Sequence, residues 1–588
     1  MKNPLVDKKS LLKVAIVLLF SCTSGCNFTN KTAEKDLDIA KNNNYVRGEL
    51  EVQHGMELFN LHCASCHNFQ ANEIGPNLSG VTSAVDKEWL VAFIKDPKAT
   101  ITSGDPRAKA LYDRYKLYMP TFTNFSATEL EDLLGFIHKF SEAEKKNNST
   151  RVGGLLDPIA AKIPTSDLNL VIEEWLTIPK SSETGPMARI NKMSGIRTKH
   201  GDRLFLADLR GKLHEITKGE VRTYLDLNEE VEKFIDHPGW GTGLGSFAFH
   251  PDFERNGLLY TTHTEPAKTV PADFAINDSI KVALQWVLME WKTEHPDADK
   301  FTGKKRELLR TDMIGSSHGF QELTFNPLAK RGDSEYGLLY LCIGDGSAAL
   351  SGYPFLCDNA SNIWGSVIRI DPAGRNSNNG KYGIPINNPF AKEAGSLGEI
   401  WARGFRNPHR ISWDQSGSGK MFISNIGQHS VEEVNLGKIG ADYGWPNREG
   451  TFLYDTEANT ELVYPIPEND GGYTYPVLQF DHDEGNAVSG GFVYAGTKIP
   501  ALKGKYIFGD IPRGTIFYSE VSQIIEGQQA PIFKMGVEMN GANTDMGAIT
   551  QNDRVDLRFG IDNDGELYIF TKSNGKVYKV VGPKTDSL

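Results

Sequence analysis

Two cysteines and a histidine lie together near the start of the chain, in the run Cys63-Ala64-Ser65-Cys66-His67. Each thiol in this pattern can add to one vinyl group of a haem, and the adjacent imidazole can take an axial position on the iron. A zinc site would need a second ligand pair at matching spacing, and the nearby sequence supplies none. The motif therefore predicts covalent haem c, with Cys63 and Cys66 as attachment points and His67 as an iron ligand.

The other four cysteines fall into two pairs with different expected roles. Cys22 and Cys26 end an N-terminal segment in which Lys8, Lys9 and Lys13 accompany a short apolar run over residues 11–20. This pattern predicts a secretory signal over residues 1–26. The stretch ending at Cys26 resembles a lipobox, so Cys26 is expected to be lipidated. Cys342 and Cys357 lie far downstream, and both a disulfide and two separate buried thiols remain open.

The length and composition of the chain predict two exported domains. A chain of 588 residues exceeds the usual size of a single core. The net charge of -12, with mixed signs, argues against a nucleic-acid surface. Residues 27–48 are expected to be a polar tether and residues 143–160 a linker, which leaves domains at 49–142 and 161–588. We expect a protein of the periplasm or cell envelope that meets the membrane only through a lipid anchor.

The pattern of residues 49–142 is helical. Ser126 and Glu129 form a capping-box signature. An apolar stripe follows on one helix face, made by Leu130, Leu133, Leu134 and Ile137. An earlier helix, which contains Leu58 and Phe59, is the expected partner, and Gly55 and Gly135 are expected to let the two backbones approach closely. The first domain is therefore predicted to be all-α.

Three runs in this domain resemble a class I cytochrome c: GMELFNLHCASCH at 55–67, GPNLSGV at 75–81 and YMPTF at 118–122. The resemblance implies that Met119 is the second axial ligand and that the Pro76 carbonyl accepts a hydrogen bond from His67. A thioether opposite an imidazole raises the haem potential, which suits an electron acceptor. Four other side chains compete for this position, namely His54, Met56, His62 and His138.

The second domain repeats a pattern of two short apolar strands joined by a turn. The instances lie at 203–216, 247–264, 323–345, 411–427, 506–521 and 557–572. Irregularly spaced β-repeats over some 420 residues are typical of a β-propeller, and their number favours six blades. The predicted fold class is an all-α domain followed by an all-β six-bladed propeller.

Blocks of the second domain resemble the soluble pyrroloquinoline quinone (PQQ)-dependent sugar dehydrogenases. They include SSHGFQELTF at 316–325, EIWARGFRNPHRISWD at 399–414 and VEEVNLGKIGADYGWP at 431–446. The resemblance implies that His318 is the catalytic base and Asp345 its acidic partner. It further assigns PQQ binding to Arg406, Asn407 and Arg513, and calcium binding to the carbonyls of Gly427 and Gln428.

The chain departs from this family at three cofactor positions. Gly241 replaces a usual Gln or Glu, Glu322 replaces an Arg, and Pro512 replaces a Lys. These departures indicate thinner cationic cover around the quinone than in the family.

Together the two domains predict an exported dehydrogenase that oxidises an aldose or a related sugar. Electrons would pass from PQQ to haem c and then to an external acceptor, such as another cytochrome or a respiratory component. Two alternatives stay open. The propeller could be a binding module for glycan or protein that lacks quinone, or an enzyme of different chemistry that uses calcium and His318.

Overall fold

The computed structural model describes residues 45, 47–64, 66–69, 72, 74–141, 151–183, 185–239 and 241–585. The expected signal segment, including Cys26, and nearly all of the 27–48 tether lie outside the described residues. The 143–160 linker is described only from Arg151 onward. Residues Tyr45–Leu588 form one compact unit, which contains both predicted domains.

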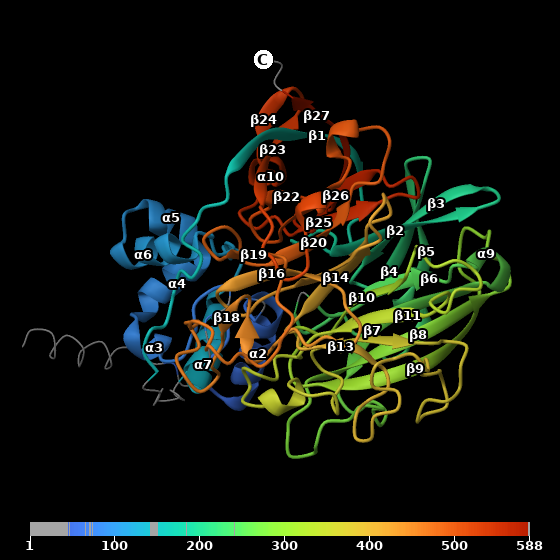
Figure 1. Ribbon diagram of the computed structural model, residues 1–588. Coiled ribbons are helices and arrows are strands. Elements are labelled where there is room, and N and C mark those ends of the chain that lie inside the picture. Colours follow the sequence, from blue (N-terminus) through green and yellow to red (C-terminus); the bar gives the residue numbers. More distant parts are fainter. Residues whose placement is uncertain are drawn as a thin grey trace, which may run out of the picture. The chain divides into compact units, whose positions relative to one another are not determined.

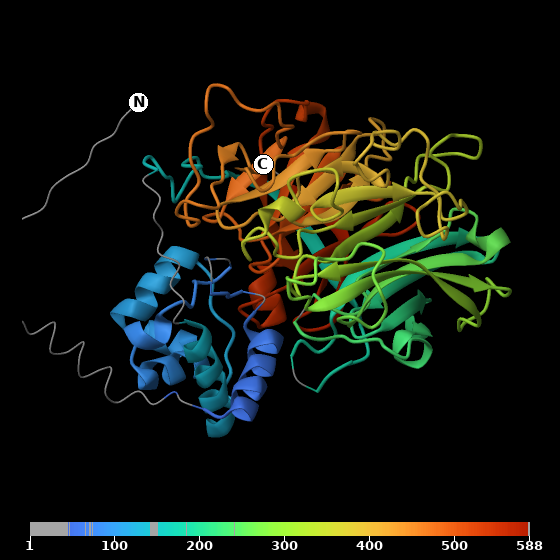
Figure 2. The ribbon, with the colours of Figure 1, turned by 90° about the horizontal axis from the view of Figure 1, so that it is seen from below.

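The first domain is helical throughout its described part, and Figures 1 and 2 show its helices packed against one another. The helices are α2 (Glu49–His62), α3 (Val81–Ala84), α4 (Lys87–Lys95), α5 (Pro97–Thr102), α6 (Pro106–Tyr115) and α7 (Ala127–Ser141). The predicted capping box at the start of α7 is confirmed. The Ser126 N–H donates to Glu129 Oε2 over 2.8 Å, and the Glu129 N–H donates to Ser126 Oγ over 3.2 Å.

The predicted packing of α2 on α7 is confirmed at one glycine and differs at the other. All four residues of the apolar stripe on α7 are buried, in one core with Leu58 and Phe59. A Cβ at Gly55 would lie 2.0 Å from the Asp132 carbonyl oxygen, so only glycine fits where α2 crosses α7. A Cβ at Gly135 would instead meet Arg47 and Tyr45, so this glycine faces the segment that precedes α2.

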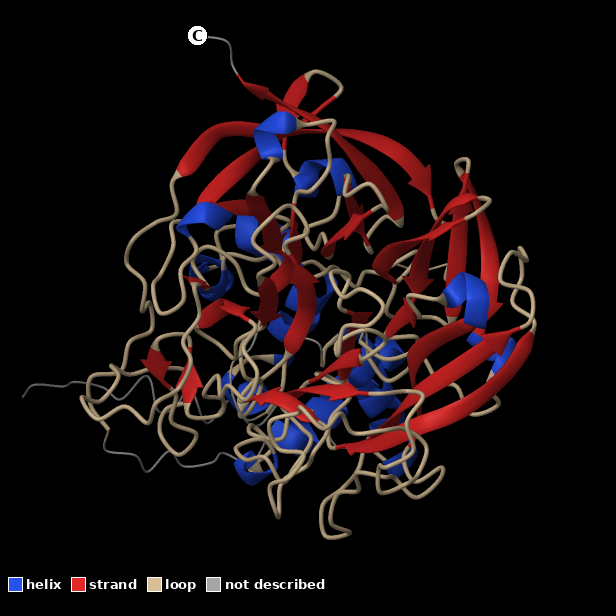
Figure 3. Ribbon diagram, turned by 45° about the vertical axis from the view of Figure 1, so that its right-hand side comes forward, coloured by secondary structure: helices blue, strands red, loops and turns tan. Residues whose placement is uncertain are grey.

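The second domain is a β-propeller built from twisted sheets (Figure 3). Within the described residues, four sheets have four strands each, arranged in chain order. Their strands are β2 (Ile190–Thr198), β3 (Gly201–Asp208), β4 (Lys212–Thr217) and β5 (Glu220–Asp226); β6 (Ser246–Phe249), β7 (Leu258–Pro266), β8 (Leu284–Thr293) and β9 (Gly303–Met313); β10 (Phe320–Phe325), β11 (Leu339–Ile343), β12 (Ser366–Ile370) and β13 (Ile400–Arg403); and β14 (Pro408–Trp413), β15 (Met421–Asn425), β16 (Val431–Leu436) and β19 (Leu478–Asp481).

The remaining long strands form one nine-stranded sheet. Its members are β20 (Val488–Val493), β21 (Lys505–Asp510), β22 (Ile516–Glu520), β23 (Phe533–Met539), β24 (Ala542–Thr544), β25 (Leu557–Ile561), β26 (Leu567–Thr571), β27 (Lys576–Thr585) and β1 (Thr165–Thr177). Strand β1 pairs antiparallel with β27 and parallel with β23, so the first strand of the domain joins its last strands.

All six predicted hairpins are antiparallel strand pairs: β3–β4, β6–β7, β10–β11, β14–β15, β21–β22 and β25–β26. Apolar clusters fill the spaces between the sheets, separately from the core of the helical domain. Smaller elements lie in the connections: α8 (Leu227–Glu230), α9 (Phe253–Asn256), α10 (Met546–Thr550) and a hairpin of β17 (Arg448–Glu449) with β18 (Phe452–Leu453). No helix in the described ranges has the length and apolar character needed to cross a membrane.

Candidate functional site

A cavity of about 180 Å³ opens inside the helical domain, and the haem-motif side chains form part of its wall. Its lining includes Cys63, Cys66, His67 and Met119, together with Leu90, Phe93, Ile94, Leu133, Leu134 and Ile137. The structure therefore brings together the four residues that are expected to hold haem c. The apolar remainder of the lining suits a porphyrin, because such a wall excludes water from the iron.

The ring of His67 is held in the orientation that an iron ligand needs. Its Nδ1 lies 2.8 Å from the Pro76 carbonyl oxygen, which confirms the expected contact. Because a carbonyl can only accept, Nδ1 carries the proton and Nε2 keeps its lone pair for a metal. A Cβ at Gly75 would lie 2.5 Å from His67 Cε1, so glycine allows this close approach of the backbone to the ring.

The structure separates the candidates for the second axial ligand. Met119 and His62 line the cavity, whereas His54, Met56 and His138 do not. His54 is paired with Asp132 at 2.8 Å, and His138 contacts Thr82 Oγ1 at 2.9 Å. His62 precedes the attachment motif directly and packs against two phenylalanine rings. Met119 comes from the loop between α6 and α7, as the sequence predicts.

The cysteines of the described residues are all free thiols. Burial raises the pKa of Cys63 to about 12. Cys66 Sγ accepts a hydrogen bond of 3.0 Å from Arg554, which belongs to the propeller. Cys342 and Cys357 are buried and form no disulfide with each other. Of the two possibilities left open by the sequence, the structure has the two separate thiols.

A second cavity, of about 150 Å³, lies in the propeller where loops and strand ends from several sheets meet. Its wall includes His318, which directly precedes β10, and Arg406 and Asn407, which precede β14. Gly427 and Gln428 follow β15 and line the cavity as well. Most of the residues that the family resemblance implies for this site thus lie on one wall. Arg513 and Asp345 are absent from the lining, and Asp345 instead contacts the lining residue His318.

His318 lines this wall and is paired with the buried Asp345. His318 Nδ1 lies 3.0 Å from Asp345 Oδ1, and Asp345 is 1% exposed. Trp445 Nε1 donates to the other carboxylate oxygen over 3.1 Å. Burial acts to raise the pKa of Asp345, but the hydrogen bond from His318 and the charges of His318 and Arg406 outweigh it, so the pKa lies below its usual value. An ionised Asp345 keeps the proton on Nδ1 and leaves the Nε2 lone pair of His318 available.

The backbone at His318 is also unusual. Its φ is +54°, a region that residues with a side chain rarely adopt. A Cβ at the neighbouring Gly319 would lie 1.9 Å from Trp286 Nε1, so the segment is pressed closely against the core. Strain of this kind is concentrated at functional sites, where the surrounding structure holds one side chain in a required position.

Arg406 forms hydrogen bonds with the loop that was expected to bind calcium. Its Nη1 donates to the Gly427 carbonyl and its Nε donates to Gln428 Oε1, both over 2.6 Å. A carbonyl that already accepts from a guanidinium is poorly placed for a divalent cation, because the two positive charges would repel each other. The Gly427 carbonyl therefore does not fit calcium in this arrangement, whereas at Gln428 Arg406 contacts the side-chain oxygen and not the backbone carbonyl.

The structure shows more cationic side chains at this cavity than the sequence interpretation expected. Arg554, Arg558 and Lys572 line it in addition to Arg406, and Asp556 is the one acid among the described lining residues. Burial lowers the pKa of Arg558 to about 9 and lowers that of Lys572 well below its usual value. Four cationic side chains thus line the cavity even though three family positions are substituted.

Two of the three substituted positions, Glu322 and Pro512, do not line the cavity, and neither does the expected PQQ contact Arg513. Glu322 forms a buried ion pair with Lys192, and neither residue lines the cavity. Arg513 donates to the His482 carbonyl over 2.6 Å and to Asn486 Oδ1 over 2.9 Å, and it is likewise absent from the lining. Arg558 is the one charged residue of β25, whereas Lys572 directly follows β26 and belongs to none of the family blocks.

Two buried acceptors on the cavity wall have no hydrogen-bond partner within the described residues: Asn407 Oδ1 and His409 Nε2. His409 Nδ1 contacts Gln321 Oε1 at 3.0 Å and therefore carries the ring proton, which leaves Nε2 as an acceptor. Buried polar atoms are rarely unsatisfied in a folded protein, so both atoms point to a bound ligand with hydroxyl or N–H donors. A polycarboxylate quinone fits the cations beside them, because carboxylates and quinone oxygens accept from guanidinium groups.

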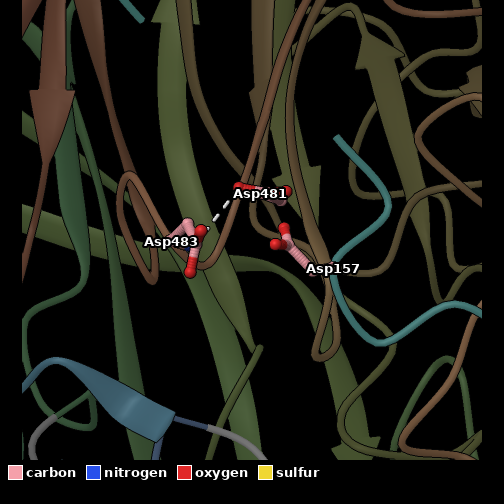
Figure 4. Close-up of side chains that lie close together, drawn as sticks. All are labelled: Asp157, Asp481 and Asp483. Carbon is pink, nitrogen blue, oxygen red and sulfur yellow. Dashed lines mark hydrogen bonds between the residues drawn. The ribbon is translucent and has the colours of Figure 1, made fainter. Parts of the chain in front are cut away.

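Within the described residues, the one group of three acidic side chains close enough to share a metal lies elsewhere (Figure 4). It consists of Asp157, Asp481 and Asp483. Asp481 already accepts from the N–H groups of Ile159 and Asp483, and Asp483 is paired with Lys162. Burial and the nearby Asp157 raise the pKa of Asp481. These carboxylates are satisfied by their neighbours, and they do not line the propeller cavity.

Comparisons with known proteins agree with this division into two domains. Residues 192–579 match the profile of the "Glucose / Sorbosone dehydrogenase" family, and residues 52–141 match that of "Cytochrome c". A Hedgehog-interacting protein of Mus musculus is 27% identical over 445 residues, which covers 69% of this chain and 57% of the relative. An aldose sugar dehydrogenase of Escherichia coli is 26% identical over 391 residues, which covers 64% and 88%.

The chain spans about half of the length of several curated relatives, between 49% and 58% for the plant, mouse and human proteins. Among solved structures, the apo-form of the soluble aldose sugar dehydrogenase from Escherichia coli is 18% identical with a TM-score of 0.48, and it covers 69% of this chain and 98% of that one. The match of the family profile to most of the propeller is the deciding observation. The chain belongs to the glucose/sorbosone dehydrogenase family and carries a cytochrome c domain ahead of the family domain.

Proposed function

We propose that this protein is an exported quinohaemoprotein dehydrogenase that oxidises the anomeric hydroxyl of an aldose or a related sugar. The observation that carries the proposal is the His318–Asp345 pair, held at the wall of a cavity rich in cations. An aldose fits because oxidation of its hemiacetal needs a base for the hydroxyl proton beside a hydride acceptor.

The chain's own part in the reaction is to move one proton and to hold charge. His318 Nε2 would take the proton from the sugar hydroxyl, since Nδ1 is kept protonated by Asp345. The imidazolium that results would be stabilised by the buried carboxylate, which stays ionised because its pKa lies below the usual value. Trp445 fixes Asp345 from the other side, so the base keeps one orientation.

The residues that would hold PQQ are the cationic and amide groups of the cavity, namely Arg406, Asn407, Arg558 and Lys572. When bound, PQQ would supply the hydride acceptor and haem c would supply a one-electron acceptor on the same chain. Tethering both groups to one polypeptide keeps the second acceptor at high effective concentration. No step is assigned to calcium.

Six blades are the architecture that we propose for the propeller. The nine-stranded sheet contains two antiparallel runs, β20 to β23 and β25 to β27 with β1, which are joined only by the parallel pairing of β1 with β23. Counting these runs as two blades and adding the four separate sheets supports this number. Pairing of the first strand with the last ones would close the ring of blades.

The signal segment over residues 1–26 and lipid attachment at Cys26 would place the protein in the periplasm or cell envelope of a bacterium. Electrons would leave the haem to an external one-electron acceptor, such as another cytochrome or a respiratory component. The net charge of -12 supports a protein partner rather than nucleic acid.

Reconstitution tests the proposal directly. Haem-loaded protein is mixed with PQQ, with and without Ca²⁺, and with a panel of aldoses while the haem absorption spectrum is followed. We expect haem reduction that requires both quinone and sugar. No reduction with any aldose, together with no PQQ binding by calorimetry, would contradict the proposal.

A matched pair of variants isolates the base. His318→Gln should lower the rate of sugar-dependent reduction by about 10²–10⁴-fold, the usual contribution of a general base. His200→Gln replaces an exposed histidine and should leave the rate unchanged. Equal rates in the two variants would remove His318 from its proposed role.

A second candidate function is a binding module for glycan or protein beside an electron-transfer cytochrome c. It is favoured by the likeness to Hedgehog-interacting proteins, which match about as much of this chain as the sugar dehydrogenase does. PQQ binding measured by calorimetry separates the two functions, because a module that lacks quinone would show none.

A further inference from the structure

The cavity of the helical domain and the cavity of the propeller share part of their walls. Among the described residues, Ile74 and Arg554 line both of them. Ile74 follows the haem motif in the helical domain, whereas Arg554 lies just before β25 in the propeller. The helical domain and the propeller therefore meet at these two side chains, one apolar and one cationic.

Arg554 is held in place from both sides. Its Nε and Nη2 donate to the two oxygens of Asp556 over 3.2 and 3.3 Å, while Nη1 donates to Cys66 Sγ over 3.0 Å. The side chain is 9% exposed. The charge of Asp556 raises the pKa of Arg554 despite burial, so the guanidinium is cationic at every working pH. A fixed positive charge thus lies against the sulfur that would carry the haem.

Two further hydrogen bonds cross between the domains near the propeller cavity. Gln428 Nε2 donates to the Asn72 carbonyl over 3.3 Å, and Gln428 also accepts from Arg406 inside the cavity. Arg513 Nη2 donates to the Tyr115 carbonyl over 3.3 Å. Arg513 bonds across the boundary as Arg554 does but lines neither cavity, so it offers a natural control residue.

We propose that Arg554 is a positioning residue that fixes the entry point for electrons at the Cys66 side of the haem. This inference rests on the proposed function. Each transfer takes one electron from the reduced cofactor in the propeller and converts haem iron from Fe(III) to Fe(II). One oxidised sugar supplies two electrons, so the haem must pass the first to an external one-electron acceptor before it takes the second. For each sugar oxidised two protons leave to solvent, one from His318 and one from the reduced quinone as it gives up its two electrons.

The choice of arginine has two consequences for the haem. A fixed positive charge near the iron favours the less positive Fe(II) state and therefore raises the reduction potential. The planar guanidinium can bond Asp556 and Cys66 at the same time, which a lysine ammonium on a flexible stem does less well. Arg554 therefore makes the haem a better acceptor and also holds its attachment residue against the dehydrogenase domain.

Redox titration of the haem tests the electrostatic part without quinone or sugar. Arg554→Gln removes the charge but keeps an amide donor for the buried Asp556. Arg554→Lys keeps the charge but loses the planar guanidinium that bonds Asp556 and Cys66 at the same time. We expect a lower midpoint potential in Arg554→Gln, a smaller shift in Arg554→Lys, and no shift in the control Arg513→Gln. Equal potentials in all four proteins would overturn the inference.

The rate of haem reduction by sugar, compared with that of a soluble dye that accepts electrons from the quinone directly, tests the positioning part. In Arg554→Gln we expect the ratio of haem reduction to dye reduction to fall at least tenfold, and in Arg513→Gln we expect an unchanged ratio. A wild-type protein that reduces neither acceptor with any sugar would overturn the proposed function. Normal dye reduction with an unchanged ratio in Arg554→Gln would overturn only the role of Arg554.

Discussion

The helical domain and the propeller build their cavities in opposite ways. The haem-binding side chains lie between residues 63 and 119, and the contacts that orient them are local, such as the bond from His67 to Pro76. Apart from Ile74, the propeller cavity draws on residues between 191 and 572, which belong to several sheets and their loops. A site made by a motif is visible in the sequence, whereas a site made by a closed ring of sheets is visible only when the ring is formed.

The two cavities also differ in polarity. The helical cavity is walled mainly by apolar side chains, which suit the apolar ring of a porphyrin. The propeller cavity carries four cationic residues, which suit an anionic group, and two unsatisfied acceptors, which suit hydroxyl or N–H donors of a ligand. Haem binding in the first cavity should therefore be lost completely when its attachment points are removed. Ligand affinity in the second cavity should depend on charge and pH.

Removal of the attachment thiols should have the largest effect. The double variant Cys63→Ser/Cys66→Ser should lose all covalently bound haem, because serine cannot form the thioether bonds. Haem that stays with the polypeptide after denaturing electrophoresis measures this loss. Cys357→Ala, which replaces a buried thiol of the propeller, should retain haem fully. Covalent haem in the double variant would show that the motif does not attach it.

Asp345→Asn should lower sugar-dependent turnover by about 10²–10⁴-fold, the range expected when a general base is disabled. The asparagine amide can donate to His318 Nδ1, which would move the ring proton to Nε2 and leave no lone pair for the sugar hydroxyl. Steady-state kinetics with a soluble dye measure the effect. Haem content and the haem spectrum should stay unchanged, and turnover at the wild-type level would contradict the role of this pair.

Lys572→Met should weaken PQQ binding by about tenfold, the loss expected for one charge-assisted hydrogen bond. Burial holds the pKa of Lys572 well below its usual value in the ligand-free protein, so an anionic ligand must restore its proton on binding. Wild-type affinity should therefore weaken as pH rises, and the variant should lose this dependence. Calorimetry at several pH values measures both effects.

The matched control for that experiment is Lys503→Met, which changes an exposed lysine outside the cavity. Its affinity and pH dependence should equal those of the wild type. An identical pH dependence in Lys572→Met and the wild type would place the titrating group elsewhere.

Glu432→Gln should have the smallest effect, a change in how stability depends on pH. Burial raises the pKa of Glu432 from 4.5 to about 7, and the side chain lies 3.1 Å from His482 Nε2. Between these two pKa values the folded state binds more protons than the unfolded state, so this group lowers stability as pH rises through that window. Glutamine keeps the contacts without titrating.

Thermal unfolding followed from pH 5 to pH 8 measures that difference. The midpoint of Glu432→Gln should fall less with rising pH than that of the wild type, by a few degrees. Parallel curves for the two proteins would show that Glu432 does not titrate in this range. His482→Asn offers a control, because it removes the neighbouring ring and leaves the carboxyl in place.

Much of the helical domain could be predicted because its signals are local. The capping box at Ser126 and Glu129, the apolar stripe on α7 and the contact between His67 and Pro76 all involve residues close together in the chain. The six hairpins of the propeller were predictable for the same reason. Gly135 was paired with the wrong neighbour, because its role depends on how a segment before α2 crosses the domain.

The propeller cavity was harder to predict because its members are brought together only by closure of the sheets. Sequence blocks indicated His318, Asp345, Arg406 and Asn407, but Arg513 bonds outside the cavity and Gly427 gives its carbonyl to Arg406. Lys572 lies outside every family block and His409 had no assigned role within its block, so nothing in the local pattern placed them at the same wall.

The sequence by itself determined the haem attachment motif, the order of the two domains and the strand pairs. Each of these features depends on residues that are close together in the chain. The tertiary structure alone decided which cations line the propeller cavity and that Arg554 reaches Cys66. The contact between Arg554 and Cys66 joins residues nearly 500 positions apart, and only the packing of the two domains brings them together.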